Sequence, residues 1–236
     1  MTMSAGRPLR RWSFPFPFPQ TLLLALAAAS VLVSPTDARA DDPLPTSPGD
    51  TPIVRVEEDW VIEIGTPDPA DHAPQIVGVI SPRNDLEGVH AVLELNHVTQ
   101  PSYVAGGMQL QRWYGPDILD YRFHPSDNLL ATENEVIRYT MVMRISNGRL
   151  RFSVTNGSSQ TWGAFGSYRQ LYTSVPTQAS DLTGYSPLTS IQHSRVGYAS
   201  HRVKKYALKE VRYYSATGLV AVDPTERNVH QYDPEE

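Results

Sequence analysis

The sequence predicts an all-β protein, built as a two-sheet antiparallel β-sandwich with no substantial helix beyond residue 40. Three observations indicate this fold. Apolar and polar residues alternate with the period of two that is typical of half-buried strands. Gly, Pro and Asn punctuate these short segments at frequent intervals. No segment shows the apolar stripe of an amphipathic helix. Many short strands with frequent turns favour two packed antiparallel sheets.

The chain begins with a predicted export signal over residues 1–40. Basic residues precede an apolar run at 21–33, and Ala38-Arg39-Ala40 follows it. This order is typical of a secretory signal peptide, and the run is shorter than the roughly 20 residues of a membrane span. We expect cleavage before Asp41 and no membrane span in the mature chain, which would then be extracellular, at the cell surface or periplasmic. Arg10-Arg11 leaves twin-arginine export open beside the general route.

Three further regions are expected after the signal. Residues 41–52 are rich in Pro, Asp and Ser, which predicts a disordered spacer. Residues 53–222 carry the alternating pattern and form the predicted sandwich domain. Residues 223–236 are polar and acidic, which predicts a flexible tail.

Composition excludes several classes of site. The chain has no cysteine, which rules out disulfides, thiol chemistry and cysteine-bound metals. Its net charge of −5 is unlike that of a nucleic-acid-binding protein. Acids dominate residues 41–71, where Arg55 is the only base, whereas residues 138–212 are strongly basic. These segments either pair with each other inside the fold, or the basic one forms a face for an anionic ligand.

The strands follow in order along the domain. We expect them at residues 54–64, 76–80, 89–95 and 108–113, with a last stretch over 195–222. The apolar parity of that last stretch changes after Leu208, which predicts a β-bulge near Lys209-Glu210. Ser215-Ala216-Thr217-Gly218 predicts a turn between its two strands.

A hairpin is the clearest local prediction. Residues 136–146 and 149–155 flank Asn147-Gly148, the preferred pair for a two-residue type I′ turn. This turn fixes the register. The expected apolar pairs are Ile145 with Leu150, Met143 with Phe152, and Met141 with Val154. On the opposite face the same register places Arg144 across from Arg151.

The polar face of this hairpin is therefore basic. It carries Arg138, Arg144 and Arg151, and like charges that lie directly opposite each other are destabilising. Carboxylates of neighbouring strands could offset the repulsion, and Glu63 and Glu94 are suitable by parity. An anion from outside, such as a sulfated or uronic-acid glycan, is the alternative.

Three segments together resemble the concanavalin A-like lectin/glucanase sandwich in its laminin-G-like form. They are EDWVIEIGTPDP, RYTMVMRISNGRLRFSVTNGSSQTWGAFG and SRVGYASHRVKKYALKEVRYYSATG. The likeness spans residues 53–222. Within this sandwich class, the chain looks most similar to secreted bacterial proteins. It implies that the first strand and a late strand lie side by side, which would bring the acids of 57–63 near the bases of 204–212.

A sugar site is the first candidate for chemistry. Gln109, Gln111 and Trp113 share one strand face, and amides beside an indole suit the hydroxyls and C–H faces of sugars. Trp162 lies in the Gly-rich loop after the hairpin and is a further candidate. The alternative is that both tryptophans are packing residues, since tryptophan is highly buried on average.

Catalysis and metal binding have weaker support. The Glu-x-Asp-x-x-Glu pattern of glycosidases with this sandwich is absent, and Glu133 and Glu135, the nearest pair, are expected in a solvated loop. No catalytic residue is assigned. His90 and Glu94 share a strand face but lie too far apart for one metal. No cofactor is expected, although Asp127, Asn128 and Asp181 offer oxygen ligands for a rim calcium, as in many sandwiches of this type.

The sequence thus favours a secreted, non-catalytic β-sandwich that binds an extracellular ligand, most simply a glycan. A glycoside-active enzyme of the same fold and a structural cell-surface or matrix protein are the alternatives. We expect no nucleic-acid partner. We also expect no membrane span in the mature chain. The expected ligand-binding residues are Gln109, Gln111, Trp113, Trp162, Arg138, Arg144 and Arg151.

Overall fold

The structure is a computed structural model that describes residues 49, 51–66, 74–96, 107–124, 126, 128, 130–167 and 169–232. The predicted export signal, most of the predicted spacer and Asp127 lie outside the described residues. Within them, no helix has the length and apolarity needed to cross a bilayer.

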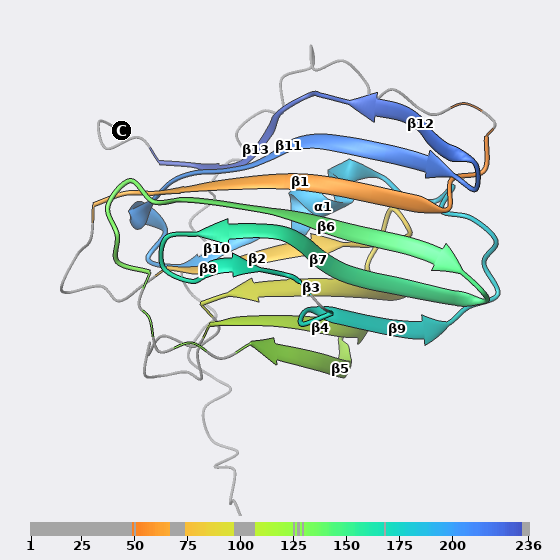
Figure 1. Ribbon diagram of the computed structural model, residues 1–236, viewed down its shortest axis with the longest axis horizontal. Helices are drawn as coiled ribbons and strands as arrows, with labels where there is room; N and C mark the ends of the chain where they lie inside the picture. Colours follow the sequence, from red (N-terminus) through yellow and green to blue (C-terminus); the bar gives the residue numbers. More distant parts are fainter. Residues whose placement is uncertain are drawn as a thin grey trace, which may run out of the picture. The chain divides into compact units, whose positions relative to one another are not determined.

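Two antiparallel sheets form the fold (Figure 1), as the sequence predicted. The larger sheet contains β1 (Arg55–Ile64), β6 (Val136–Ser146), β7 (Arg149–Ser159), β8 (Gly163–Phe165), β9 (Tyr172–Pro176), β11 (Val203–Ser215), β12 (Gly218–Asp223) and β13 (Arg227–Gln231). The smaller sheet contains β2 (Gln75–Ile80), β3 (Val89–Leu95), β4 (Met108–Tyr114), β5 (Asp117–His124) and β10 (Arg195–Tyr198). The helical elements described are the short α1 (Pro187–His193) and a single 3₁₀ turn (Ser200–Arg202).

The strand order explains which segments meet. The larger sheet runs β12-β11-β1-β6-β7-β8, with β13 beside β11 and β9 beside β7. The smaller sheet runs β10-β2-β3-β4-β5. The first strand and the late strand β11 therefore lie side by side, and β1 separates β11 from the predicted hairpin (Figure 1).

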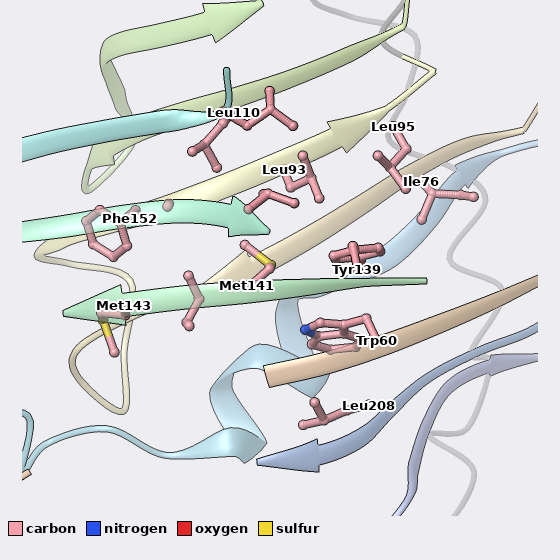
Figure 2. Packing of buried hydrophobic residues seen from close by; sticks show 14 of the residues in the cluster. Trp60, Ile76, Leu93, Leu95, Leu110, Tyr139, Met141, Met143, Phe152 and Leu208 are labelled. Atoms are coloured by element: carbon pink, nitrogen blue, oxygen red, sulfur yellow. The ribbon is translucent and has the colours of Figure 1, made fainter. Parts of the chain in front are cut away.

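The core fills the space between the sheets, where Figure 2 shows apolar side chains of both layers meeting. Trp60 of β1 stacks on Tyr139 of β6 at 6.5 Å between ring centroids and tilts against Tyr206 at 5.1 Å. The two tyrosine hydroxyls hydrogen-bond at 3.0 Å. Gly78 of β2 lies over this pair, and a Cβ there would approach the Tyr206 hydroxyl to 2.9 Å. Glycine therefore permits the sheets to pack closely above the tyrosines.

The β6–β7 hairpin has the register that the Asn147-Gly148 turn predicts. All three expected apolar pairs occur, and each of their side chains is less than 10% exposed. Arg144 lies opposite Arg151, again as expected. The alternation of β6 and β7 thus divides their side chains between the core and the outer face of the larger sheet.

Bulges adjust two strands. The register of β1 with β11 shifts between Asp59 and Trp60, which leaves Lys209 unpaired and confirms the expected bulge. β7 continues through Asn156-Gly157 as far as Ser159, with Asn156 at φ 55°. A local bulge against β6 accommodates these two residues.

The strands extend beyond residue 222, the expected end of the domain. β13 pairs with β11 although it lies in the segment expected to be a flexible tail. Asp223 and Arg227 form a buried ion pair of 2.8 Å at its start, which fixes the entry of this strand. α1, β5 and β9 were not expected. α1 and β9 are short and carry no clear alternation, whereas residues 119–124 of β5 do alternate between apolar and polar side chains.

Candidate ligand-binding site

A row of arginines crosses the outer face of the larger sheet. Arg55 of β1 is the Cα partner of Arg144 of β6, and Arg144 is the Cα partner of Arg151 of β7. These three strands lie side by side (Figure 1), so three cationic side chains occupy neighbouring positions on one face. Their strand neighbours of opposite parity, such as Val56 and Met143, belong to the core.

The row borders a hollow of about 390 Å³, here called the arginine hollow. Its lining residues are Arg55, Val142, Arg144, Arg151, Ser153, Thr155, Arg169 and Tyr172. Arg169 has a left-handed backbone with φ 63°, which bulky residues adopt rarely. Its guanidinium carbon lies 5.3 Å from the ring centroid of Tyr172, within cation–π range. The hollow therefore combines four guanidinium groups with the hydroxyls of Ser153 and Thr155 and the phenol ring of Tyr172.

Internal carboxylates neutralise only part of this charge. Arg55 forms an ion pair with Glu57, and Glu57 also accepts hydrogen bonds from Arg212 at 3.0 Å and Tyr214 at 2.9 Å. Burial alone would raise the pKa of Glu57, but these donors and the Arg55 charge outweigh burial and lower the pKa. Glu57 is thus shared by two arginines, and no acidic residue is among those that line the arginine hollow.

The other arginines of the row have no anionic partner among the described residues. Arg151 donates to the Ser146 hydroxyl, and Arg144 is exposed. Glu63 and Glu94, the partners expected by parity, contact neither of them: Glu63 lies farther along β1, and Glu94 accepts a hydrogen bond from Gln111 on the other sheet. The Arg144–Arg151 pair is therefore cationic, with Arg144 exposed and Arg151 half-buried.

A second hollow of about 550 Å³ adjoins the first on the same face and is here called the mixed hollow. Its charged and polar lining residues are Asp59, Glu63, Arg138, Thr140, Asn156, Lys205, Lys209 and Arg212. Most of its bases are paired. Arg212 contacts Asp59, Glu57 and Glu210, and the hydrogen bonds that it donates to Asp59 above all raise its pKa. Lys205 and Lys209 both pair with Glu226, whose pKa they lower.

This pairing accounts for much of the charge asymmetry of the sequence. The acids of β1 meet the bases of β11, as the side-by-side arrangement implied. Arg138 is the exception in the mixed hollow: it is exposed and forms no ion pair with any described residue. The unneutralised positive charge of the face is therefore concentrated on β6 and β7.

The other candidate face belongs to the smaller sheet. Gln109, Gln111 and Trp113 do share the outer side of β4, but they bind one another. The Trp113 indole donates to Gln111 at 2.7 Å, and the Gln111 amide donates to Gln109 at 2.7 Å and to Glu94 at 3.0 Å. Gln109 is 8% and Gln111 4% exposed, and His90 stacks on Trp113. Sugar binding here stays a prediction, with the amides largely engaged.

Trp162 and Glu135 lie at the β7–β8 turn, whereas Glu133 lies near the end of β1. Trp162 is half-buried and packs against the main core, apart from Trp113, which packs on the outer side of the smaller sheet. Glu133 is exposed and accepts from Thr66 at 2.9 Å. Glu135 was expected to be solvated but is fully buried. Hydrogen bonds from the backbone and side chain of Thr161 offset the cost of burying its carboxylate. Glu135 thus holds the turn together.

Metal ligands do not converge in the described part of the chain, where no group of three or more acidic or histidine side chains could hold an ion. The His90 Nδ1 lies 3.0 Å from the Gly88 carbonyl oxygen. Asn128 donates to the Thr161 carbonyl at 3.1 Å, and Asp181 accepts from the backbone of Thr183 at 3.1 Å. These side chains serve local turns.

Sequence reasoning missed several residues of the arginine hollow. Arg55 was recognised only as the lone base of an acidic segment, and its place in the row depends on the pairing of β1 with β6. Arg169 and Tyr172 come from a loop and a short strand without a sequence signature. Positive-φ arginines such as Arg169 carry no local signal in the sequence.

No protein-family model matches the chain, and no curated protein matches it significantly. Its function must therefore be inferred from the residues themselves.

Proposed function

We propose that this chain is an exported, non-catalytic β-sandwich that binds an anionic glycan in the arginine hollow. The observation that carries the proposal is the row of Arg55, Arg144 and Arg151 on adjacent strands, with Arg169 beside it. Like charges opposite each other are destabilising in the free protein. A bound sulfate or carboxylate would offset that repulsion through charge-assisted hydrogen bonds.

A glycan suits the remainder of the hollow. Ser153 and Thr155 supply hydroxyls, and the ring of Tyr172 offers an apolar surface for sugar C–H groups. The predicted export signal would place the protein where such polymers occur. We also propose a concanavalin A-like, laminin-G-like sandwich, which the side-by-side pairing of β1 and β11 supports.

The carboxylates nearest the arginine hollow are held in ion pairs, which favours binding over glycoside cleavage. Glu57 and Asp59 share one face of β1, at a spacing that could suit a pair of catalytic acids. Arg212 contacts both, and the pKa of Glu57 is lowered. A general acid needs the opposite shift, since it must hold a proton near neutral pH.

The experiment compares dextran sulfate, polygalacturonate and uncharged dextran by titration calorimetry. We expect both anionic polymers to bind, the neutral one not to bind, and affinity to fall steeply with salt. Arg144→Ala and Arg151→Ala should each weaken binding about ten- to hundredfold. Neither change should lower the stability of the free protein. Arg83→Ala is the matched control, because Arg83 is exposed and paired with Asp85 elsewhere.

Binding that both hollow variants leave unchanged would refute the proposal. A reducing-sugar assay on the same polymers tests the enzyme alternative. Turnover that Glu133→Gln and Glu135→Gln each abolish would establish a glycosidase instead.

A further inference from the structure

We propose that the ligand is a linear polyanion that runs parallel to β6 and occupies the arginine hollow and the mixed hollow together. This inference rests on the proposed function, and it adds the length, direction and charge spacing of the ligand. The two hollows are adjacent on one face, and β6 contributes residues to both of them.

The outward positions of β6 connect the hollows without interruption. Arg138 and Thr140 line the mixed hollow, and Val142 and Arg144 line the arginine hollow. Strand residues advance about 3.3 Å each, so the Cα atoms of Arg138 and Arg144 are separated by roughly 20 Å. A disaccharide is too short to reach both arginines, whereas a hexasaccharide can.

The outward side chains of β6 from Arg138 to Arg144 form a line with two cationic ends and a neutral middle. Arg138 and Arg144 are both exposed, and neither forms an ion pair with a described residue. Between them, Thr140 donates to Asp59 at 2.7 Å, and Val142 is 9% exposed. A ligand with anionic groups several sugars apart would satisfy both ends without placing an anion against the middle.

The mixed hollow has little capacity for an anion apart from Arg138. The bases Arg212, Lys205 and Lys209 are already held by carboxylates. We therefore assign primary binding to the arginine hollow and place Arg138 as the second anchor, which only a longer ligand can reach. Linking two such contacts makes the second one intramolecular and raises affinity well beyond that of either contact.

A glycan fits this line better than a single-stranded nucleic acid. Nucleic-acid strands bind on exposed aromatic rings that stack successive bases. The outward side chains between the two arginines are Thr140 and Val142, which provide no ring. The ring of Tyr172 lies in the arginine hollow and faces Arg169.

The test uses heparin-derived oligosaccharides of two, four, six and eight sugar units, with affinity measured by calorimetry at fixed salt. We expect the hexasaccharide to bind at least about a hundredfold more tightly than the disaccharide, with little further gain beyond it. Arg138→Ala should weaken the hexasaccharide about tenfold or more and leave the disaccharide unchanged. Arg144→Ala should weaken both lengths, and Arg138→Lys should retain most of the hexasaccharide affinity.

Several results would overturn the inference. One is an affinity that rises only severalfold from the disaccharide to the hexasaccharide. A longer chain can bind a single site in several overlapping positions, and this alone explains so small a gain without a second anchor. Another is an Arg138→Ala variant that affects both lengths equally or neither. In each case, binding that still depends on Arg144 would leave the proposed function intact. A single-stranded oligonucleotide of matched charge that binds as tightly, with the same dependence on Arg138, would overturn the glycan assignment.

Discussion

Replacing Glu58 by glutamine should stabilise the protein above neutral pH and leave its stability nearly unchanged in acid. Glu58 points into the core from β1 and is fully buried. Its carboxyl group accepts hydrogen bonds from the Trp60 indole at 3.1 Å, the Tyr185 hydroxyl at 2.8 Å and the Ser190 hydroxyl of α1. None of these donors is charged. Burial therefore dominates and raises the pKa of Glu58 to about 7, although the hydrogen bonds oppose the shift.

The magnitude follows from proton linkage. The native protein retains a proton on Glu58 that the unfolded chain, with a pKa near 4.5, releases. The stabilisation is complete below pH 4.5 and is lost as the pH rises towards 7. The difference between the two pKa values corresponds to roughly 3 kcal/mol. Glutamine resembles the protonated acid and does not titrate. The free energy of unfolding of Glu58→Gln should therefore exceed that of the parent protein by up to roughly 3 kcal/mol at alkaline pH.

Urea titrations between pH 4 and pH 8 measure this difference directly. Glu57 supplies the matched control, because it directly precedes Glu58 on the same strand but faces outward. Its pKa is lowered, so Glu57→Gln should cost more stability at pH 8 than in strong acid. A Glu58→Gln variant that is destabilised equally at pH 4 and pH 8 would refute the reasoning.

Three further predictions concern packing and export. Phe152→Ala should destabilise the protein by roughly 3–5 kcal/mol in urea titration, since the ring is 1% exposed in the core. Gly157→Ala should cost about 1–3 kcal/mol, because a Cβ there would lie 2.2 Å from the Phe165 ring; wild-type stability would contradict that packing. The exported protein should begin at Asp41, and N-terminal sequencing that finds Met1 retained would exclude the predicted signal.

The parts of the fold that local chemistry determines could be predicted from the sequence. Asn147-Gly148 sets the β6–β7 register, and with it the opposition of Arg144 and Arg151. The parity change after Leu208 located the bulge at Lys209. By contrast, β5 was missed although residues 119–124 alternate between apolar and polar side chains. This strand lies at the edge of its sheet, and its apolar face stays exposed and outside the core.

The complete arginine hollow could not be predicted, because it depends on contacts between distant segments. Arg55 joins the row only through the pairing of β1 with β6, and Tyr172 through the pairing of β9 with β7. Glu58 is different. Its position between Val56 and Trp60 already indicates an inward-facing carboxylate, a signal that sequence reasoning could have used.

Amide chemical-shift mapping with a sulfated hexasaccharide tests the central claim most directly, because it reports which sheet face the ligand contacts. The proposal predicts that the perturbed amides cluster around Arg138, Arg144 and Arg151 on β6 and β7, and that Arg144→Ala moves these changes to about ten- to hundredfold higher ligand concentration. Perturbations confined to Gln111 and Trp113 on β4, with β6 and β7 unaffected, would contradict it.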